Sequence, residues 1–489
     1  MSNRNIEREE KWDVPVGFAI PDLGAVLPAR ATLRTERVHL SSTYFDTPRR
    51  DLLEADVSLR RRTGDTDTGW QAKLASRTGS RIEITEPLHT AHDEDVTPPA
   101  AITGLLAGLQ RGRELRPIAI VRTERIVHSI HDEFGILLLE LADDTVHSTA
   151  IGDSAEIRAW REVEVELKHR PEKLLRRVGK ALERAGATPR LGSSKLARAL
   201  GADGDAAPPA VIQQGIAPQP ATDPITGYLA QQYRDLVAGD LDLRAERNAV
   251  HPTRVACRRI RSTLRVFAPV LVDVDPALDA EVAWYAALLG EVRDVQVMRE
   301  HFRHALADVP IELELGPVAA RISMGLDELE RDGFTRLRSA MESTRYFALL
   351  DSVQELVERQ LTIKGRRRKQ VQKLVEKADR KFDRRLRAAL RSPDDDAALH
   401  RARKSAKRAR YAYEAAAPAG AKRRVRQFKR LQETLGNFQD AVVAKQLLRT
   451  WATATAGRAD ENGFTFGLLW QRADETQRAV RRSLRGGGS

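Results

Sequence analysis

The spacing of apolar and polar residues divides the chain into two halves of different character. Up to about residue 200, short segments alternate with period two, as over 75–87, 135–144 and 160–168, and this alternation is typical of half-buried β-strands. From about Ile225 onward, long Ala-, Leu- and Arg-rich stretches repeat with a period near 3.6 residues, typical of amphipathic α-helices. The pattern predicts an α+β protein with a β-rich N-terminal domain and an all-α C-terminal domain.

The boundary between the halves is marked by composition. Residues 201–224, GADGDAAPPAVIQQGIAPQPATDP, are rich in Ala, Pro, Gly and Gln and show no period, which is typical of a linker. We therefore expect a first domain over 1–200, a linker over 201–224 and a helical domain over 225–485. The length of 489 residues agrees with more than one core.

The helical half contains an internal repeat. The segment 250–267 matches 399–414, and 288–297 matches 434–443. Such a duplication predicts two helical bundles packed side by side, one over about 225–360 and the other over about 366–485.

Charge and composition narrow the function. No apolar run approaches the roughly 18 residues of a membrane span, and there is no signal-peptide pattern. The single cysteine, Cys257, excludes an internal disulfide. We therefore expect a cytoplasmic protein without a membrane partner. The net charge is +12, and residues 366–410 hold 18 basic against 6 acidic side chains. Such a field attracts polyanions. Aromatic residues are not interleaved with this block, which disfavours single-stranded nucleic acid.

Charged side chains recur on one face of nearly every expected strand of the first half. A sheet face that carries both acidic and basic side chains cannot be buried without water or a ligand. A barrel of about eight strands would enclose one ligand. Bases there could bind phosphate oxygens while carboxylates coordinate Mg²⁺ or Mn²⁺. Taken singly, each residue is more often a surface charge, and Arg60 and Arg62 could simply pair with acids on a neighbouring strand. The residues are Glu7, Glu9, Lys11, Arg60, Arg62, Lys73, Arg125 (with Arg122 as the alternative), Glu140, Glu162, Glu164, Glu166 and Lys168.

Six motifs in this order resemble the CYTH domain, the fold of the triphosphate tunnel metalloenzymes. The resemblance covers about residues 3–200 and implies an eight-stranded antiparallel tunnel that hydrolyses or binds triphosphate compounds. The motifs are ExExK (7–11), TYFDTP (43–48), SLRRR (58–62), the strand of Lys73, EVEVELK (162–168) and LGSSKLARAL (191–200).

The resemblance also implies roles for individual residues. The metal would be held by Glu7, Glu9, Glu164 and Glu166, with Glu140 as a further acid, and the phosphates by Lys11, Arg60, Arg62, Lys73, Arg125 and Lys195. Glu7, Glu9 and Lys11 are the expected catalytic residues. Phosphoryl transfer needs no protein nucleophile, because it depends mostly on positioning and charge neutralisation.

The helical half carries a stripe of cations. In the first repeat the spacing of 3, 4, 3 and 4 places the stripe within an arc of roughly 80° on a helix; the second repeats the first three steps. Pro252 fits the first turn of a helix, and Asp294 and Asp440 are candidate partners of some arginines. The alternative interpretation is a solvated helix face. The stripe consists of His251, Arg254, Arg258, Arg261 and Arg265, then His400, Arg403, Lys407 and Arg410.

The pattern VHxxRVxxRRxR followed by LGxxRD resembles a CHAD domain, a conserved histidine α-helical domain, over about residues 225–485. The resemblance implies two pseudo-symmetric four-helix bundles whose basic helices face a central channel that binds inorganic polyphosphate. The second copy departs at Lys407 and Gln439, where the first has arginines.

We therefore predict a CYTH–CHAD protein that hydrolyses inorganic triphosphate with Mg²⁺ or Mn²⁺ and binds inorganic polyphosphate, with possible association with polyphosphate granules. Two alternatives stay open: a non-catalytic polyphosphate-binding scaffold, and a tunnel that acts on an organic triphosphate such as thiamine triphosphate or ATP. Nucleic-acid binding through the arginine stripe is disfavoured.

Overall fold

The computed structural model divides into two compact units, Met1–Ala217 and Pro218–Ser489, each described by itself. Within the described residues, no helix combines the length and apolar character that crossing a bilayer requires. The structure describes residues 8–28, 30–64, 68–75, 81–88, 97–152, 154–169, 173–190, 194–201, 223–361, 368–392, 394–418, 420–455 and 463–486.

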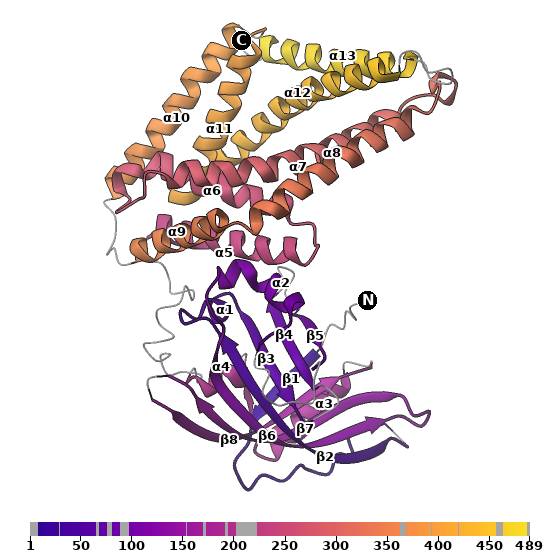
Figure 1. Cartoon of the computed structure of the whole chain (residues 1–489), viewed down its shortest axis with the longest axis vertical. Helices are drawn as coiled ribbons and strands as arrows, with labels where there is room; N and C mark the ends of the chain where they lie inside the picture. The colour runs from indigo at the N-terminus through magenta and orange to yellow at the C-terminus, as the bar shows by residue number, and fades with distance from the viewer. Residues whose placement is uncertain are drawn as a thin grey trace. The chain divides into compact units, whose positions relative to one another are not determined.

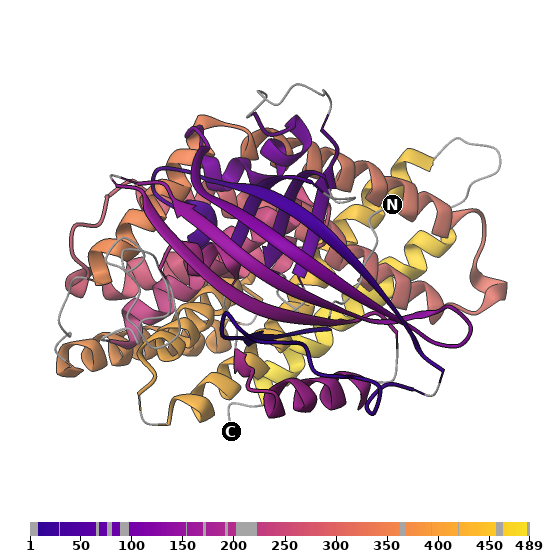
Figure 2. The ribbon, with the colours of Figure 1, turned by 90° about the horizontal axis from the view of Figure 1, so that it is seen from below.

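The first unit is built on one antiparallel sheet with the strand order β5-β4-β3-β2-β6-β7-β8-β1-β9. Figures 1 and 2 show the long strands running side by side as a curved, twisted surface. The strands are β1 (Arg8–Asp13), β2 (Thr32–Asp46), β3 (Val57–Thr63), β4 (Gly69–Ala75), β5 (Arg81–Glu86), β6 (Arg116–His131), β7 (Leu137–Ala150), β8 (Glu156–Leu167) and β9 (Thr188–Arg190).

The expectation of a closed eight-stranded barrel is corrected by this topology. The sheet has nine strands in the described residues, and β5 and β9 form its two edges rather than pairing with each other. The additional strand, β9, has only three residues and pairs with β1, which places Lys11 opposite Arg190. The tunnel is therefore an open, curved sheet whose inner face carries the charged residues.

One end of the outer face is covered by helix α3 (Lys173–Arg184). Trp12, Ile130 and Val163 from the sheet form an apolar cluster with Leu174 and Val178 of the helix. This burial determines which face of the sheet each side chain occupies. Because Trp12 is directed to the outer face, its neighbour Lys11 is directed to the inner face. Three short helices complete the unit: α1 (Asp51–Glu54), α2 (Ala100–Gln110) and α4 (Lys195–Ala199).

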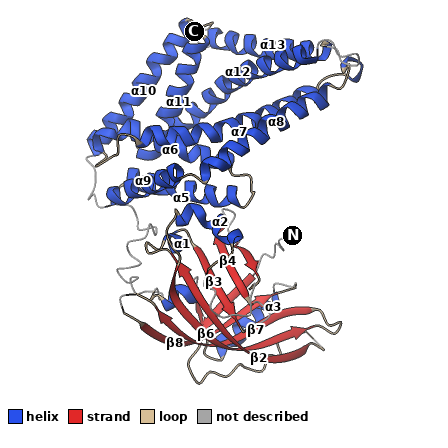
Figure 3. Ribbon diagram, in the orientation of Figure 1, coloured by secondary structure: helices blue, strands red, loops and turns tan. Residues whose placement is uncertain are grey.

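The second unit is helical (Figure 3), so the predicted α+β class with a β-rich half followed by an all-α half is confirmed. Asp223 caps the first helix by accepting bonds from the backbone amides of Ile225 and Thr226. The α-helices are α5 (Pro224–Arg244), α6 (Val250–Phe267), α7 (Leu278–Ala307), α8 (Val318–Met341), α9 (Thr344–Leu361), α10 (Arg368–Arg391), α11 (Asp396–Ala416), α12 (Ala421–Thr455) and α13 (Phe464–Gly486).

The sequence predicts two four-helix bundles packed side by side, and the two repeats pack against each other in the described residues. The first repeat contributes five α-helices in the described residues and the second contributes four. One apolar core is shared between them, because Phe302 of α7 and Ile322 of α8 belong to the same cluster as Leu448 of α12 and Phe466 of α13. Figure 1 shows these two helical hairpins extending together. The helices α7 and α12 have 30 and 35 residues, and their distal halves share this apolar core.

Candidate functional site

The inner face of the sheet brings charged residues from four strands into register. Lys11 of β1 lies opposite Glu164 of β8, and Glu162 lies opposite Asp144 of β7. Asp144 in turn lies opposite Arg125 of β6. Directly opposed residues of antiparallel strands have adjacent side chains, so the alternation in the sequence becomes one patch of alternating charge.

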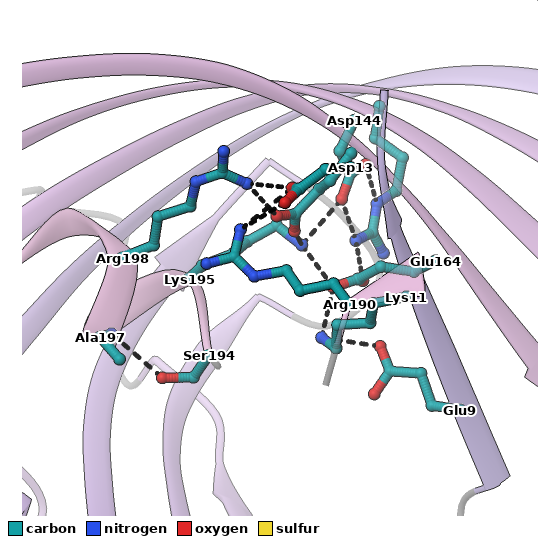
Figure 4. Close-up of polar contacts among 12 residues, drawn as sticks. Glu9, Lys11, Asp13, Asp144, Glu164, Arg190, Ser194, Lys195, Ala197 and Arg198 are labelled. Atoms are coloured by element: carbon teal, nitrogen blue, oxygen red, sulfur yellow. Dashed lines mark hydrogen bonds and ion pairs between the residues drawn. The ribbon is translucent and has the colours of Figure 1, made fainter. Parts of the chain in front are cut away.

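At the centre of this patch is a group of three carboxylates. Oxygens of Asp144, Glu162 and Glu164 lie within 4.8 Å of one another. The ammonium of Lys195 contacts all three, at 2.9 Å, 2.6 Å and 2.7 Å respectively. Figure 4 shows Lys195 directed from its short helix toward Asp144 and Glu164. We call these three acids the carboxylate triad; they could hold a metal ion.

Helix α4 delivers Lys195 to the triad. Ser194 caps the helix by accepting a hydrogen bond of 3.1 Å from the backbone amide of Ala197. Leu196 and Ala199 then pack against apolar residues of the sheet, among them Tyr44 and Val121. The ammonium is thus held by the packing of its own helix as well as by its ion pairs.

Further cations lie beside the triad: Lys11, Arg125 and Arg198, the last at 3.5 Å from Glu162. Lys11 donates to Glu164 at 2.5 Å and pairs with Glu9 at 3.0 Å. Arg125 donates to both oxygens of Asp144, at 2.8 and 2.7 Å, and reaches Glu164 at 3.1 Å. The bidentate bond fixes the guanidinium plane.

The cations determine the ionisation of two triad members, Glu164 and Asp144. Burial favours the neutral acid, but Lys195, Lys11 and Arg125 outweigh burial and hold the pKa of Glu164 well below its usual range. The pKa of Asp144 is lowered in the same way: burial opposes ionisation, and Lys195 and Arg125 prevail. Burial disfavours the charge on Lys195, yet the acids raise its pKa. Asp144 and Glu164 are therefore charged at neutral pH and paired with neighbouring cations.

A second polar group occupies the inner face of β2–β5. Arg60 donates to Gln71 at 2.6 Å and lies 3.8 Å from Glu83, which also pairs with Lys73 at 3.3 Å. The Tyr44 hydroxyl accepts from Arg60 at 3.4 Å. The next arginine on the same strand face, Arg62, donates to the Ser42 hydroxyl at 3.3 Å. Both arginines and Lys73 thus share the inner face, and Arg60 and Lys73 share one acid, Glu83.

The structure separates the acids expected to hold metal. Glu7 lies outside the described residues. Glu9 stands beside Lys11, whereas Glu140 and Glu166 share Lys168, at 3.0 and 2.6 Å, in an ion-pair group of their own. Of the expected set, Glu164 alone belongs to the described carboxylate triad.

Several inner-face residues were missed or misjudged at the sequence level. Asp144 follows Glu140 by four positions on the same strand, so continuing the period-two pattern would have found it; Glu162 was aligned with the other acids without being assigned to the metal. Arg122, the alternative to Arg125, is exposed on the opposite face. Asp13 also lies on the inner face, where Arg190 and Arg198 pair with it at 3.0 and 2.6 Å; these pairs form through β9 and α4, which no local pattern predicts.

The helical unit gathers its basic residues where α6 and α11 meet. The positive charges of Arg254 and Arg258 act on Lys407 across this contact, together with those of Arg403 and Arg410 of its own helix. We call His251, Arg254, Arg258, His400, Arg403, Lys407 and Arg410 the basic cluster.

The stripe of cations on α6 has two parts, and the second begins at Arg261. Arg261 and Arg265 both donate to Asp279 of α7, with Nε–Oδ1 distances of 3.3 and 2.9 Å. By contrast, the buried Nε atoms of Arg258 and Arg403 find no hydrogen-bond acceptor in the described part of the chain, whereas the Nε of Arg410 lies 3.3 Å from Glu414. Buried donors without acceptors are costly, so an anion at Arg258 and Arg403 would relieve this cost.

Burial and the neighbouring cations lower the pKa of three members of the cluster, Lys407, His251 and His400. Burial, followed by the charges of Arg403, Arg258 and Arg254, lowers the pKa of Lys407 to about 7. Burial and neighbouring cations also lower the pKa of His251 and of His400. A bound anion would reverse these shifts.

Comparison with known proteins identifies the class. The family profile of the CYTH domain matches residues 6–200, and that of the CHAD domain matches residues 227–449. The chain belongs to the family of CYTH–CHAD proteins, which join a triphosphate-tunnel domain to a conserved histidine α-helical domain. Relatives from two strains of Mycobacterium tuberculosis, CDC 1551 and H37Rv, are both named as uncharacterized proteins. Each is 32% identical over 510 residues, covering 98% of this chain and 95% of the relative.

Solved structures resemble single domains of this chain. The CHAD domain from the plant Ricinus communis is 22% identical with a TM-score of 0.44 and covers 54% of this chain and 92% of its own. PptA from Streptomyces chartreusis is 23% identical with a TM-score of 0.44, covering 55% and 99%. A protein from Hippeastrum, described as a putative adenylyl cyclase with a dominant triphosphatase activity, is 19% identical with a TM-score of 0.26, covering 39% and 93%.

Proposed function

We propose that the N-terminal unit hydrolyses inorganic triphosphate with the help of Mg²⁺ or Mn²⁺, and that the helical unit binds inorganic polyphosphate. The observation that carries the first part is the carboxylate triad enclosed by Lys11, Arg125 and Lys195 on a polar sheet face. Family membership supports it, because CYTH proteins act as triphosphatases or cyclases.

The triad fits a hard divalent cation. Its three members offer carboxylate oxygens within 4.8 Å of one another, and oxygen ligands of this kind suit Mg²⁺ and Mn²⁺. Such an ion would neutralise charge on the phosphate oxygens during phosphoryl transfer. Lys195 now supplies the positive charge between the acids. If the three acids held a divalent cation, the ammonium of Lys195 would be available to bind phosphate.

The remaining cations bind and orient the substrate. Arg125 is held rigidly by Asp144 and presents its guanidinium beside the triad. Arg60 and Lys73 share Glu83 farther along the inner face, so they offer positive charge to the distal end of an extended phosphate chain. Positioning and charge neutralisation are what phosphoryl transfer chiefly requires.

The proposed reaction is tested by Glu164→Gln in the full-length protein. Phosphate release from inorganic triphosphate with Mg²⁺ or Mn²⁺ should fall by at least about 100-fold, the scale of one lost electrostatic contact in the transition state. Binding of long-chain polyphosphate should be unchanged. The matched control is Glu156→Gln, because Glu156 lies on the same strand, is exposed and pairs with Arg158. Undiminished turnover in the Glu164 variant would refute the assignment.

The same assay separates the alternatives. A scaffold protein would release no phosphate from any triphosphate while still binding polyphosphate. A tunnel for organic substrates would turn over ATP or thiamine triphosphate faster than inorganic triphosphate. Either result would replace the proposed activity of the N-terminal unit and leave the helical unit's role to be judged by binding.

The polyphosphate-binding role rests on the basic cluster. Seven basic residues stand on α6 and α11, which contact each other, and the buried Nε atoms of Arg258 and Arg403 lack acceptors in the described residues. An extended chain of phosphates supplies many acceptor oxygens at once, which a single small anion does not.

A further inference from the structure

Two glycines stand in the interior of long helices at equivalent positions of the repeat. Gly290 lies in α7 and Gly436 in α12, each after a leucine and four residues before an aspartate. Glycine is among the least favourable residues in a helix interior. Its use at both positions therefore needs a local reason.

At Gly290 the reason is an arginine of the basic cluster. The guanidinium of Arg254 crosses from α6 and lies over the glycine. A Cβ atom at Gly290 would stand 3.0 Å from Nη2, 3.2 Å from Nε and 3.4 Å from Cζ of Arg254. The Nη2 atom also lies 3.7 Å from Asp294, one turn farther along α7. The guanidinium thus lies close to the helix at the glycine and next to the aspartate.

The second repeat has the same arrangement with more space. At Gly436, a Cβ atom would meet only Nη2 of Arg403, at 3.8 Å, which is an ordinary van der Waals separation. Asp440, one turn farther on, acts electrostatically on Arg403. An alanine would therefore be accommodated at 436 but would displace the arginine at 290.

We infer that Gly290 is a positioning residue that sets the Arg254 guanidinium in the orientation that binds polyphosphate, whereas Gly436 exerts no such control over Arg403. The inference rests on the proposed polyphosphate binding. An added methyl group at 290 meets only the flexible end of a side chain, so Arg254 moves and the helix stays. The guanidinium is then displaced by a few tenths of an ångström, which changes its orientation toward Asp294 and toward the cluster.

The test compares Gly290→Ala with the matched control Gly436→Ala in the full-length protein. Titration calorimetry with long-chain inorganic polyphosphate should show several-fold weaker binding for the first variant and wild-type binding for the second. Both should melt at or above the wild-type temperature, because alanine is the better helix former. In an Arg254→Ala background, Gly290→Ala should have no further effect, since the glycine acts through that side chain.

Each other outcome counts against the inference. Equal binding by the two glycine variants, or additive losses with Arg254→Ala, would show that Gly290 does not act through Arg254. A fall in melting temperature for Gly290→Ala alone would show that the helix gives way instead of the arginine. Absence of polyphosphate binding by the wild-type protein would refute the proposed function rather than the inference that Gly290 orients Arg254.

Discussion

Replacing Lys195 with methionine removes the positive charge shared by the carboxylate triad while keeping most of the side chain's volume. The Lys195 side chain is 11% exposed, and its ammonium lies within 2.9 Å of all three acids, of which Asp144 is fully buried. Breaking a buried ion pair by removing one partner costs about 3–5 kcal/mol. Arg125 and Lys11 remain beside the acids, so we expect the lower end, about 3 kcal/mol.

This loss should appear in the thermal unfolding of the N-terminal unit. For a domain of about 200 residues, 1 kcal/mol shifts the melting temperature by roughly 2–4 °C, which predicts a fall of about 6–12 °C. Differential scanning calorimetry on the full-length protein measures it, with the transition of the helical unit as internal reference. Excess Mn²⁺ should recover most of the loss and stabilise the variant more than the wild type, because the ion takes the place of the ammonium.

Lys168→Met is the matched control for this experiment. Lys168 also pairs with two acids, Glu140 and Glu166, but its side chain is 33% exposed, so its loss should cost less than about 1 kcal/mol. Mn²⁺ should stabilise this variant no more than the wild type. If Lys195→Met melted like the wild type, or if Mn²⁺ stabilised both variants equally, the triad would not be the cation site that Lys195 occupies.

Three further predictions follow from individual contacts. The affinity for polyphosphate should fall by up to tenfold per pH unit above pH 7. In the free protein Lys407 has a pKa of about 7 and loses its proton above that pH, whereas bound phosphates favour the protonated form, so binding there requires uptake of a proton. Lys407→Arg should flatten the pH profile of affinity measured by calorimetry, and an unchanged profile would contradict the assignment. Arg125→Ala should slow triphosphate hydrolysis by about 10–100-fold, equivalent to about 1.5–3 kcal/mol, whereas Arg122→Ala on the outer face should leave the rate unchanged; equal rates would remove Arg125 from the site. Gly239→Ala should destabilise the helical unit by roughly 3 kcal/mol or more in urea unfolding, because a Cβ there would stand 2.0 Å from Oγ1 of buried Thr253; a wild-type midpoint would show that α5 and α6 do not cross this closely.

The set of charged residues on the inner face of the sheet could be predicted from the sequence, because it depends on local alternation. Period-two spacing placed Lys11, Arg60 and Glu164 on one face, and the register confirms that they share it. The same rule favoured Arg125 over Arg122. Alternation predicts the face of the sheet but not the pairing register between strands. Glu140 of β7 and Glu164 of β8 therefore share a face yet belong to different ion-pair groups.

The parts that escaped prediction depend on contacts between distant segments. Asp13 acquires Arg190 and Arg198 only because β9 adds to the sheet edge and α4 folds onto the inner face. Likewise, the helical periodicity identified the basic stripe but did not reveal that Asp279 of the following helix engages Arg261 and Arg265. Helix spacing reports which residues share a face, not what a neighbouring helix presents to them.

The apolar core shared by α7, α8, α12 and α13 has a consequence for the duplicated architecture. A chain ending at residue 361 would leave Phe302 and Ile322 without the covering side chains of Leu448 and Phe466. Exposed apolar surface of that kind drives association. One repeat alone is therefore not a self-sufficient folding unit, and a single-copy form of this domain would have to cover the surface with a second copy of itself.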